Sequence, residues 1–186
     1  DLALFRSHGF RPRKDGAAVR LTPPLDWAAD PFNDRNWCFQ LHAWRMNAPL
    51  LKAYHTTGDQ DLLRQAFTYA QDWWRFHRQS AKTPFTWKDM AVGLRAMQIA
   101  FFLQGARRGD LSLSSAEAAT LNQLASRHYA KLSQESSLRM NNHGLFQAYG
   151  LKLLSEVLGT EDGIADDFLR KIMLSQFTEA GVHKEN

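Results

Sequence analysis

Apolar residues recur at three- and four-residue intervals along most of the chain after Asn36, and this spacing constrains the fold more than any other feature. Such a period is typical of amphipathic helices, whereas a half-buried strand alternates every second residue. No segment shows a convincing two-residue alternation. The sequence therefore predicts an all-α protein, with helices at about 37–51, 60–77, 87–105, 115–132, 144–158 and 162–178.

Capping and breaking residues mark the predicted helix ends. Gly58 stops one helix and Asp59 is a suitable N-cap for the next, while Ser114 and Glu117 have the spacing of a capping box. Pro49 kinks or divides the first predicted helix. Since the turns are short, neighbouring helices should pack antiparallel. The sequence thus predicts an array of helical hairpins that forms a solenoid, a bundle or part of an α/α toroid.

Residues 1–35 differ in composition from the rest of the chain. They contain four of the six prolines together with several turn-forming residues. We interpret this segment as an irregular lead-in, pinned to the body by Trp27 and Phe32. The 186 residues are enough for one domain with a real core, and we assign 36–186 to that helical domain.

Charge and cysteine content exclude several classes of function. The net charge of +4 fits an anionic partner, but no run of lysine and arginine stands out, so nucleic acid is not expected. No apolar stretch approaches the ~20 residues that span a bilayer, so membrane insertion is not expected. Cys38 is the only cysteine and the histidines lack paired ligand spacing. We therefore predict no disulfide, no metal site and no cofactor in this segment.

Aromatic residues make up 12% of the chain and include six tryptophans. Buried rings explain such a content in most proteins. Flat rings that stack on sugar faces in a carbohydrate cleft would explain it equally well. The sequence alone leaves both interpretations open.

The first polar cluster surrounds Trp37 at the start of the first predicted helix. It consists of Arg35, Asn36, Gln40 and His42, and Asn36 and Gln40 should share one helix face. Amides can bind sugar hydroxyls and a guanidinium can bind a carboxylate, as a sugar acid requires. An N-cap followed by an internal polar network is the alternative interpretation.

A second cluster contains Trp87, Asp89 and Arg95. Asp89 and Arg95 are too far apart for a standard pair on one helix, so Arg95 has no obvious local partner. It is either a binding residue or an arginine at the surface, exposed or paired with another helix.

A third cluster, Asn142-His143-Gly144, lies between a polar loop and a predicted helix start. A helix N-terminus offers free N–H groups and favours negative charge. Asparagine beside histidine there could neutralise the carboxylate of a uronic acid and remove its weakly acidic C5 proton. A capping asparagine with a turn glycine is the plain alternative. A fourth cluster, His183 and Glu185, is either a frayed tail or a further part of such a site.

Taken in order, these clusters resemble the helical domain of heparinase II/III-type polysaccharide lyases. Each match is weak alone, but their order along nearly the whole chain is fairly specific. The residues that carry the resemblance are Trp27, Asp30-Pro31-Phe32, Arg35-Asn36-Trp37, Phe39-Gln40-Leu41-His42, Tyr54, Thr57-Gly58-Asp59, Asp72-Trp73, Trp87, Arg95, Asn142-His143-Gly144, Gly181, His183 and Glu185-Asn186.

The resemblance implies an incomplete α/α toroid followed by a β-sandwich, and β-elimination at a uronic acid that leaves a 4,5-unsaturated sugar. Asn142 matches the carboxylate-neutralising asparagine, and His143 matches the histidine assigned as base or neutraliser. The catalytic tyrosine is implied to follow Asn186, so this segment should be inactive by itself. The implied substrate-binding residues are Arg35, Asn36, Gln40, His42, Trp87, Arg95, His183 and Glu185.

The implied partners are a uronate-containing polysaccharide or oligosaccharide and the C-terminal remainder of the same chain. The implied location is periplasmic or secreted. Two alternatives differ in kind. A non-catalytic helical-repeat carbohydrate-binding module would need no convergent Asn-His site. Another α/α-toroid sugar enzyme, such as an unsaturated-uronate hydrolase or an epimerase, would need paired acids, for which Asp72, Asp89 and Asp166 are the candidates.

Overall fold

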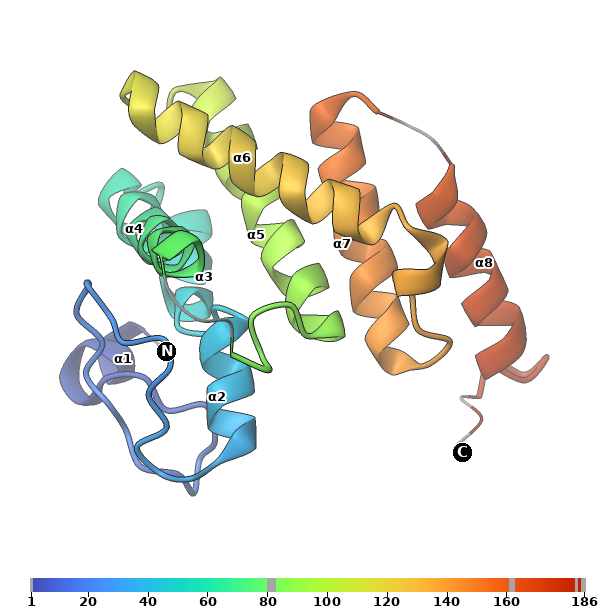
Figure 1. The fold of residues 1–186 in the computed structure, drawn as a ribbon, viewed down its shortest axis with the longest axis horizontal. Helices are drawn as coiled ribbons and strands as arrows, with labels where there is room; N and C mark the ends of the chain where they lie inside the picture. The colour runs from blue at the N-terminus through green and yellow to red at the C-terminus, as the bar shows by residue number, and fades with distance from the viewer. Residues whose placement is uncertain (1, 80–82, 161–162, 183, 185–186) are drawn as a thin grey trace.

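The computed structural model describes residues 2–79, 83–160, 163–182 and 184 (Figure 1). Within them, no β-strand accompanies the helices, and an isolated bridge joins Phe10 to Val19, so the predicted all-α class is confirmed. The elements are α1 (Leu2–His8), α2 (Arg35–His42), α3 (Asn47–Thr57), α4 (Gln60–Gln79), α5 (Asp89–Arg108), α6 (Ser115–Leu132), the 3-10 turn η1 (Glu135–Ser137), α7 (Asn142–Leu158) and α8 (Ile164–Gln176).

Two expectations for the first third of the chain are wrong in detail. The lead-in is not wholly irregular, because it begins with the short helix α1. The helix expected at 37–51, with a kink or break at Pro49, is two helices, and the break lies earlier, at Ala43–Met46, where Trp44 has a φ of 55°. Pro49 then falls in the first turn of α3, where its missing N–H breaks no intrahelical bond.

The predicted caps are present. Ser114 and Glu117 form a reciprocal capping box at α6, and the Asp59 carboxylate accepts a hydrogen bond from the Asp61 N–H at 3.0 Å. Gly58 ends α3 in a left-handed conformation with φ 73°. The helix expected to stop near Gly105 continues to Arg108 and ends at Gly109.

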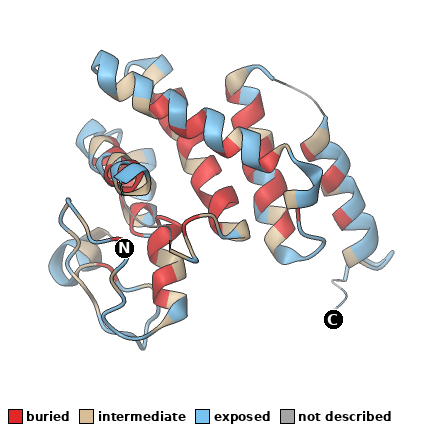
Figure 2. Cartoon of the chain, in the orientation of Figure 1, coloured by how far each residue is buried: buried red, intermediate tan, exposed pale blue. Residues whose placement is uncertain are grey.

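The helices form hairpins in which α5 and α6 are antiparallel, as are α7 and α8, whereas α5 and α7 run parallel (Figure 1). At their crossing, a Cβ on Gly93 would meet the Phe146 carbonyl, and one on Gly150 would meet the Gly93 carbonyl. Buried residues dominate α5 and α7, while α6 and α8 are mostly exposed (Figure 2). An alternation of inner and outer helices is typical of an α/α toroid. That these helices form part of such a ring stays a prediction.

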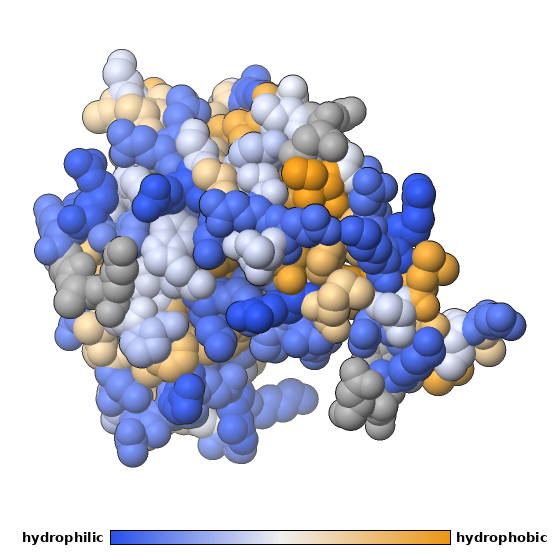
Figure 3. Space-filling model, turned by 45° about the vertical axis from the view of Figure 1, so that its right-hand side comes forward, coloured by the Kyte–Doolittle hydropathy of each residue, from blue (hydrophilic) through white to orange (hydrophobic). Residues whose placement is uncertain are grey.

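Apolar surface is concentrated on the side of the molecule where α7 and α8 lie (Figure 3). Phe146 and Tyr149 of α7 and Met173 and Leu174 of α8 are among the exposed large hydrophobic side chains, and Leu174 is 75% exposed. Burying such side chains would be favourable. This face therefore suits contact with a further protein segment.

The centre of the core is the guanidinium of Arg95, which is 0% exposed. It donates to the carbonyls of His42 at 2.6 Å and Thr86 at 2.7 Å, and to His128 Nε2 at 3.0 Å. Its carbon lies 4.3 Å from the centroid of Trp73, a cation–π contact. The surface position and the ion pair considered for Arg95 are both wrong. Burial lowers its pKa to about 9, so the side chain stays charged at neutral pH.

His128 is held as the neutral imidazole by its two contacts. Because the Arg95 Nε–H can only donate, His128 Nε2 must accept, and His128 Nδ1 therefore donates to the Leu124 carbonyl at 2.8 Å. Burial and the neighbouring guanidinium lower the pKa of His128 well below its usual value. A second proton would place two cations in contact inside the core.

His42 is 1% exposed and adopts the opposite tautomer. The Trp73 indole N–H donates to His42 Nδ1 at 3.1 Å, so His42 Nε2 carries the proton and donates to the Trp27 carbonyl at 2.8 Å. Burial and Arg95 lower the pKa of His42 to about 4. In this position the ring cannot contact a polysaccharide, and its contacts instead join α2, α4 and the lead-in.

We expect Gly150→Ala to destabilise the fold by about 1–3 kcal/mol, because the added methyl group would force α5 and α7 apart. Urea unfolding followed by circular dichroism measures this change. Gly16→Ala is the matched control, since its Cβ would meet nothing nearer than 3.5 Å. Equal stability of both variants would contradict the close crossing.

Acid should destabilise the protein between pH 6.5 and about 4. In that window the unfolded chain binds protons at His42 and His128 that the folded core excludes, so stability falls as pH falls. The shift at His42 alone corresponds to about 3 kcal/mol. Urea midpoints measured across this range should drop steeply, and His42→Gln should flatten the dependence. His55→Gln, at an exposed histidine, should leave it unchanged.

Candidate functional site

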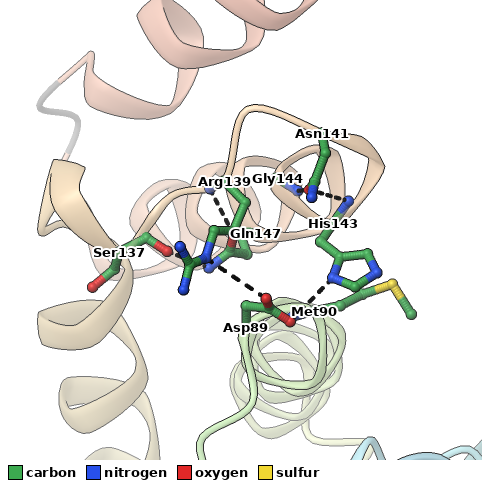
Figure 4. A network of polar contacts seen from close by, with 8 residues as sticks. All are labelled: Asp89, Met90, Ser137, Arg139, Asn141, His143, Gly144 and Gln147. Atoms are coloured by element: carbon green, nitrogen blue, oxygen red, sulfur yellow. Dashed lines mark hydrogen bonds and ion pairs between the residues drawn. The ribbon is translucent and has the colours of Figure 1, made fainter. Parts of the chain in front are cut away.

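A polar network joins the N-terminal ends of α5 and α7 (Figure 4). Because the two helices run parallel, both begin at the same side of the molecule. Asp89 in the first turn of α5 therefore meets His143 in the first turn of α7, with 3.2 Å between Asp89 Oδ1 and His143 Nδ1. Sequence analysis named both residues but did not connect them.

Asp89 is fixed before any ligand binds. Its Oδ1 accepts a hydrogen bond from the Met90 N–H at 2.7 Å, and its side chain is only 16% exposed. The start of α5 favours a negative charge there. Arg139 Nε lies 3.7 Å from Asp89 Oδ2 and adds a second positive partner. These contacts keep the carboxylate aimed at the imidazole.

The contact with Asp89 also determines which nitrogen of His143 is free. A carboxylate accepts, so His143 Nδ1 carries a proton and Nε2 keeps its lone pair in the neutral ring. The side chain is 37% exposed. His143 is therefore an oriented base that a ligand can reach, in the arrangement by which a carboxylate assists a catalytic histidine.

The two asparagines at the start of α7 have different roles. Asn141 caps the helix, because its Oδ1 accepts from the N–H groups of His143 at 2.9 Å and Gly144 at 3.4 Å. Asn142, at the first position of α7, is exposed, and its side chain has no hydrogen-bond partner within the part of the chain that the structure describes. The capping role considered for Asn142 is performed by Asn141. The side-chain amide of Asn142 can therefore donate to a ligand.

The loop before α7 is held by Gln147, which sequence analysis missed. Its side chain is 2% exposed, accepts from the Arg139 N–H at 3.0 Å and donates to the Ser137 carbonyl at 2.8 Å. A side chain on Gly144 would collide with the Arg139 carbonyl, so the loop packs directly on the helix. The sequence signal that could have revealed this role is the position of Gln147, a polar residue on the apolar face of the predicted helix.

Helix α2 lies beside α5 and carries four of the predicted substrate residues, of which His42 is buried. Ala43, Ala91 and Leu94 form a small apolar cluster, against which Phe39 and Met90 pack. This cluster brings α2 next to the turn that bears Asp89. On α2, Arg35 is exposed and Asn36 and Gln40 are partly exposed. Gln40 Nε2 donates to Asn36 Oδ1 at 3.3 Å, which confirms their shared face.

A pocket of about 310 Å³ opens where the lead-in meets α2 and α3, and Gln40 is among its lining residues. Arg11, Lys14 and Arg45 also line it, and no acidic side chain among the described residues does. None of these three cations forms an ion pair with a described residue. The pocket suits an anionic group, although Asp89 and His143 are not part of its lining.

The remaining predicted residues lie elsewhere. His42 and Arg95 belong to the buried core network, so a direct substrate contact is wrong for both in this structure. Trp87 is partly buried, packs against His128 with 5.1 Å between ring centroids, and lines a pocket beside α6. His183 and Glu185 lie outside the described residues.

The three acids considered for a hydrolase each have a separate partner. Asp72 accepts from the Leu25 N–H and the Trp27 indole, whereas Asp89 contacts His143 and Asp166 contacts Lys152. Across residues 2–79, 83–160, 163–182 and 184, no three His, Cys, Asp or Glu side chains are grouped so as to hold a metal ion. None of the described helices is both long and apolar enough to cross a bilayer.

Comparison with known proteins bears on this arrangement. The sequence model of the family described as Heparinase II/III N-terminus matches residues 1–155. Neither a curated protein nor a solved structure matches the chain. The matched range includes α1 to α6, the start of α7 and the Asp89–His143 pair. The chain therefore belongs to the heparinase II/III N-terminal family, as the resemblance of its sequence motifs predicted.

Proposed function

We propose that this chain is the N-terminal helical part of a polysaccharide lyase that cleaves a uronate-containing polymer by β-elimination. The family is one of polysaccharide lyases. The observation that carries the proposal is an exposed Asn142 beside a His143 whose free nitrogen is set by Asp89. This combination supports an acid–base reaction on a ligand bound at the start of α7.

The first task of the site is to make the C5 proton of the uronate removable. Asn142 donates to the sugar carboxylate, and the N-terminus of α7 adds its positive end. Both act on the negative charge that builds up on the carboxylate as the proton leaves. The exposed Asn142 amide supports this role.

His143 Nε2 then takes the C5 proton, and the Asp89 carboxylate stabilises the imidazolium that forms. The electron pair left on C5 forms the C4–C5 double bond, and the bond from C4 to the glycosidic oxygen breaks. The leaving oxygen needs a proton from a general acid. We assign that acid to the tyrosine expected beyond Asn186.

The substrate side of the proposal rests on charge. Arg35, Asn36 and Gln40 on α2, with the cationic pocket beside Gln40, supply donors for hydroxyls and carboxylates. His42 and Arg95 act as positioning residues, because Arg95 bonds the last carbonyl of α2. A polymeric substrate favours a periplasmic or secreted enzyme. The apolar face of α7 and α8 suits the C-terminal remainder of the chain.

We expect His143→Ala and Asn142→Ala to reduce turnover by about 10²-fold or more, with unchanged helical content. The variants are made in a protein that carries this chain together with the residues expected to follow it. Ultraviolet absorbance of the conjugated product reports turnover on a panel of uronate polymers, and His55→Ala is the control. Full activity of both variants would contradict the assigned site, whereas polymer binding without any product would favour a non-catalytic module.

Asp89→Asn should also lower kcat by about 10²-fold or more, because an amide can hold the imidazole in the wrong tautomer and cannot stabilise its charge. KM should change little, since Asp89 contacts His143 rather than the sugar. The same change at the exposed Asp166, whose partner is Lys152, is the matched control. An equal kcat in the two variants would contradict a role for Asp89 in the proposed reaction.

A further inference from the structure

A second candidate site lies on the outer surface formed by α4 and α6. Two pockets of about 390 Å³ and 580 Å³ share the lining residues Arg127 and Ala130 and so lie side by side, and together we call them the α4–α6 groove. Trp87 lines one pocket and Trp74 lines the other. Neither pocket includes Asp89, Asn142 or His143, so this α4–α6 groove is separate from the lyase site.

The charges of the α4–α6 groove are all positive. Arg78, Arg127 and Lys131 line it and are exposed, and no acidic residue of the described chain does. None of the three forms an ion pair within the described ranges, whereas Arg64, elsewhere on α4, is paired with Glu117 of α6 at 2.7 Å. Three cations without counterions on one surface favour an anionic ligand.

The aromatic side chains of the groove are held in place. The Trp74 indole N–H donates to Gln123 Oε1 at 3.2 Å, which also turns the NH₂ group of Gln123 toward other acceptors. Trp87 packs against Trp73 with 5.8 Å between ring centroids, and against His128 at 5.1 Å. Trp74 is only 9% exposed and Trp87 is partly buried, so each offers a limited apolar contact that does not have to be ordered when a ligand binds.

The groove is also elongated. Gln123, Arg127 and Lys131 follow one face of α6 at four-residue spacing, and Gln134 lies just beyond the end of that helix. At 1.5 Å per residue the part of this stripe on α6 is about 12 Å long, which exceeds the size of a single small anion. Its chemistry therefore suits an extended ligand that repeats along its length.

We propose that the α4–α6 groove is a second binding site for a uronate oligosaccharide, distinct from the Asp89–His143 pair. Trp87 and the accessible part of Trp74 provide apolar contacts, amides bind hydroxyls, and Arg78, Arg127 and Lys131 bind carboxylates. The choice of a uronate rests on the proposed function, but the site needs no catalysis. Its role is to hold one stretch of polymer while another is cleaved, which raises the effective concentration of substrate.

An alginate hexasaccharide titrated into the 186-residue chain tests this proposal by NMR. The indole N–H signals of Trp74 and Trp87 should shift on binding. Arg127→Glu combined with Lys131→Glu should weaken binding by at least about tenfold, whereas Arg107→Glu combined with Arg170→Glu, with the same charge change at exposed arginines elsewhere, should have little effect.

Two outcomes would overturn the proposal. Equal weakening by both double variants would indicate a diffuse effect of net charge, and equal binding of a single-stranded DNA of matched charge would remove the sugar assignment. Because the readout is binding, absence of lyase product in the separate turnover assay would reject the proposed reaction without affecting this result. Circular dichroism of each variant verifies that the fold is retained.

Discussion

A charged guanidinium buried without a carboxylate is the constraint on which the rest of this structure depends. Arg95 binds the carbonyl that ends α2, the Thr86 carbonyl just before α5, and His128 of α6. Burying a charge is costly unless hydrogen bonds and nearby electron density compensate it. Here carbonyls, a neutral imidazole and the face of Trp73 do so. One side chain thereby joins three parts of the chain at fixed positions.

The candidate site is a consequence of that centre and of the α5–α7 crossing. Thr86 lies three residues before Asp89, so the bond from Arg95 steadies the turn that delivers the carboxylate. Gly93 and Gly150 allow the two backbones to approach, which brings Asp89 and His143 together. Gln147 fixes the loop on the other side. The orientation of His143 therefore depends on the close packing of the α5 and α7 backbones as well as on its contact with Asp89.

Local rules predicted much of the fold and less of the site. The capping box at Ser114 and the stop at Gly58 depend on residues a few positions apart, so the sequence displays them. The Asp89–His143 pair spans 54 residues, and only the parallel packing of α5 and α7 reveals it. Arg95 and His42 were misjudged because polar side chains are usually exposed, and burial depends on partners contributed by other helices.

The direct backbone contact of α5 with α7 has a mechanical consequence. Helices that touch through glycine cannot slide or separate without losing close contacts over their whole interface, so Asp89 and His143 move as one rigid body. We therefore expect any relative movement of the helices at the boundaries of that body, at α2 and its small apolar cluster on one side and at α8 on the other. In the proposed reaction, movement of these flanks would leave the geometry of the Asp89–His143 pair unchanged.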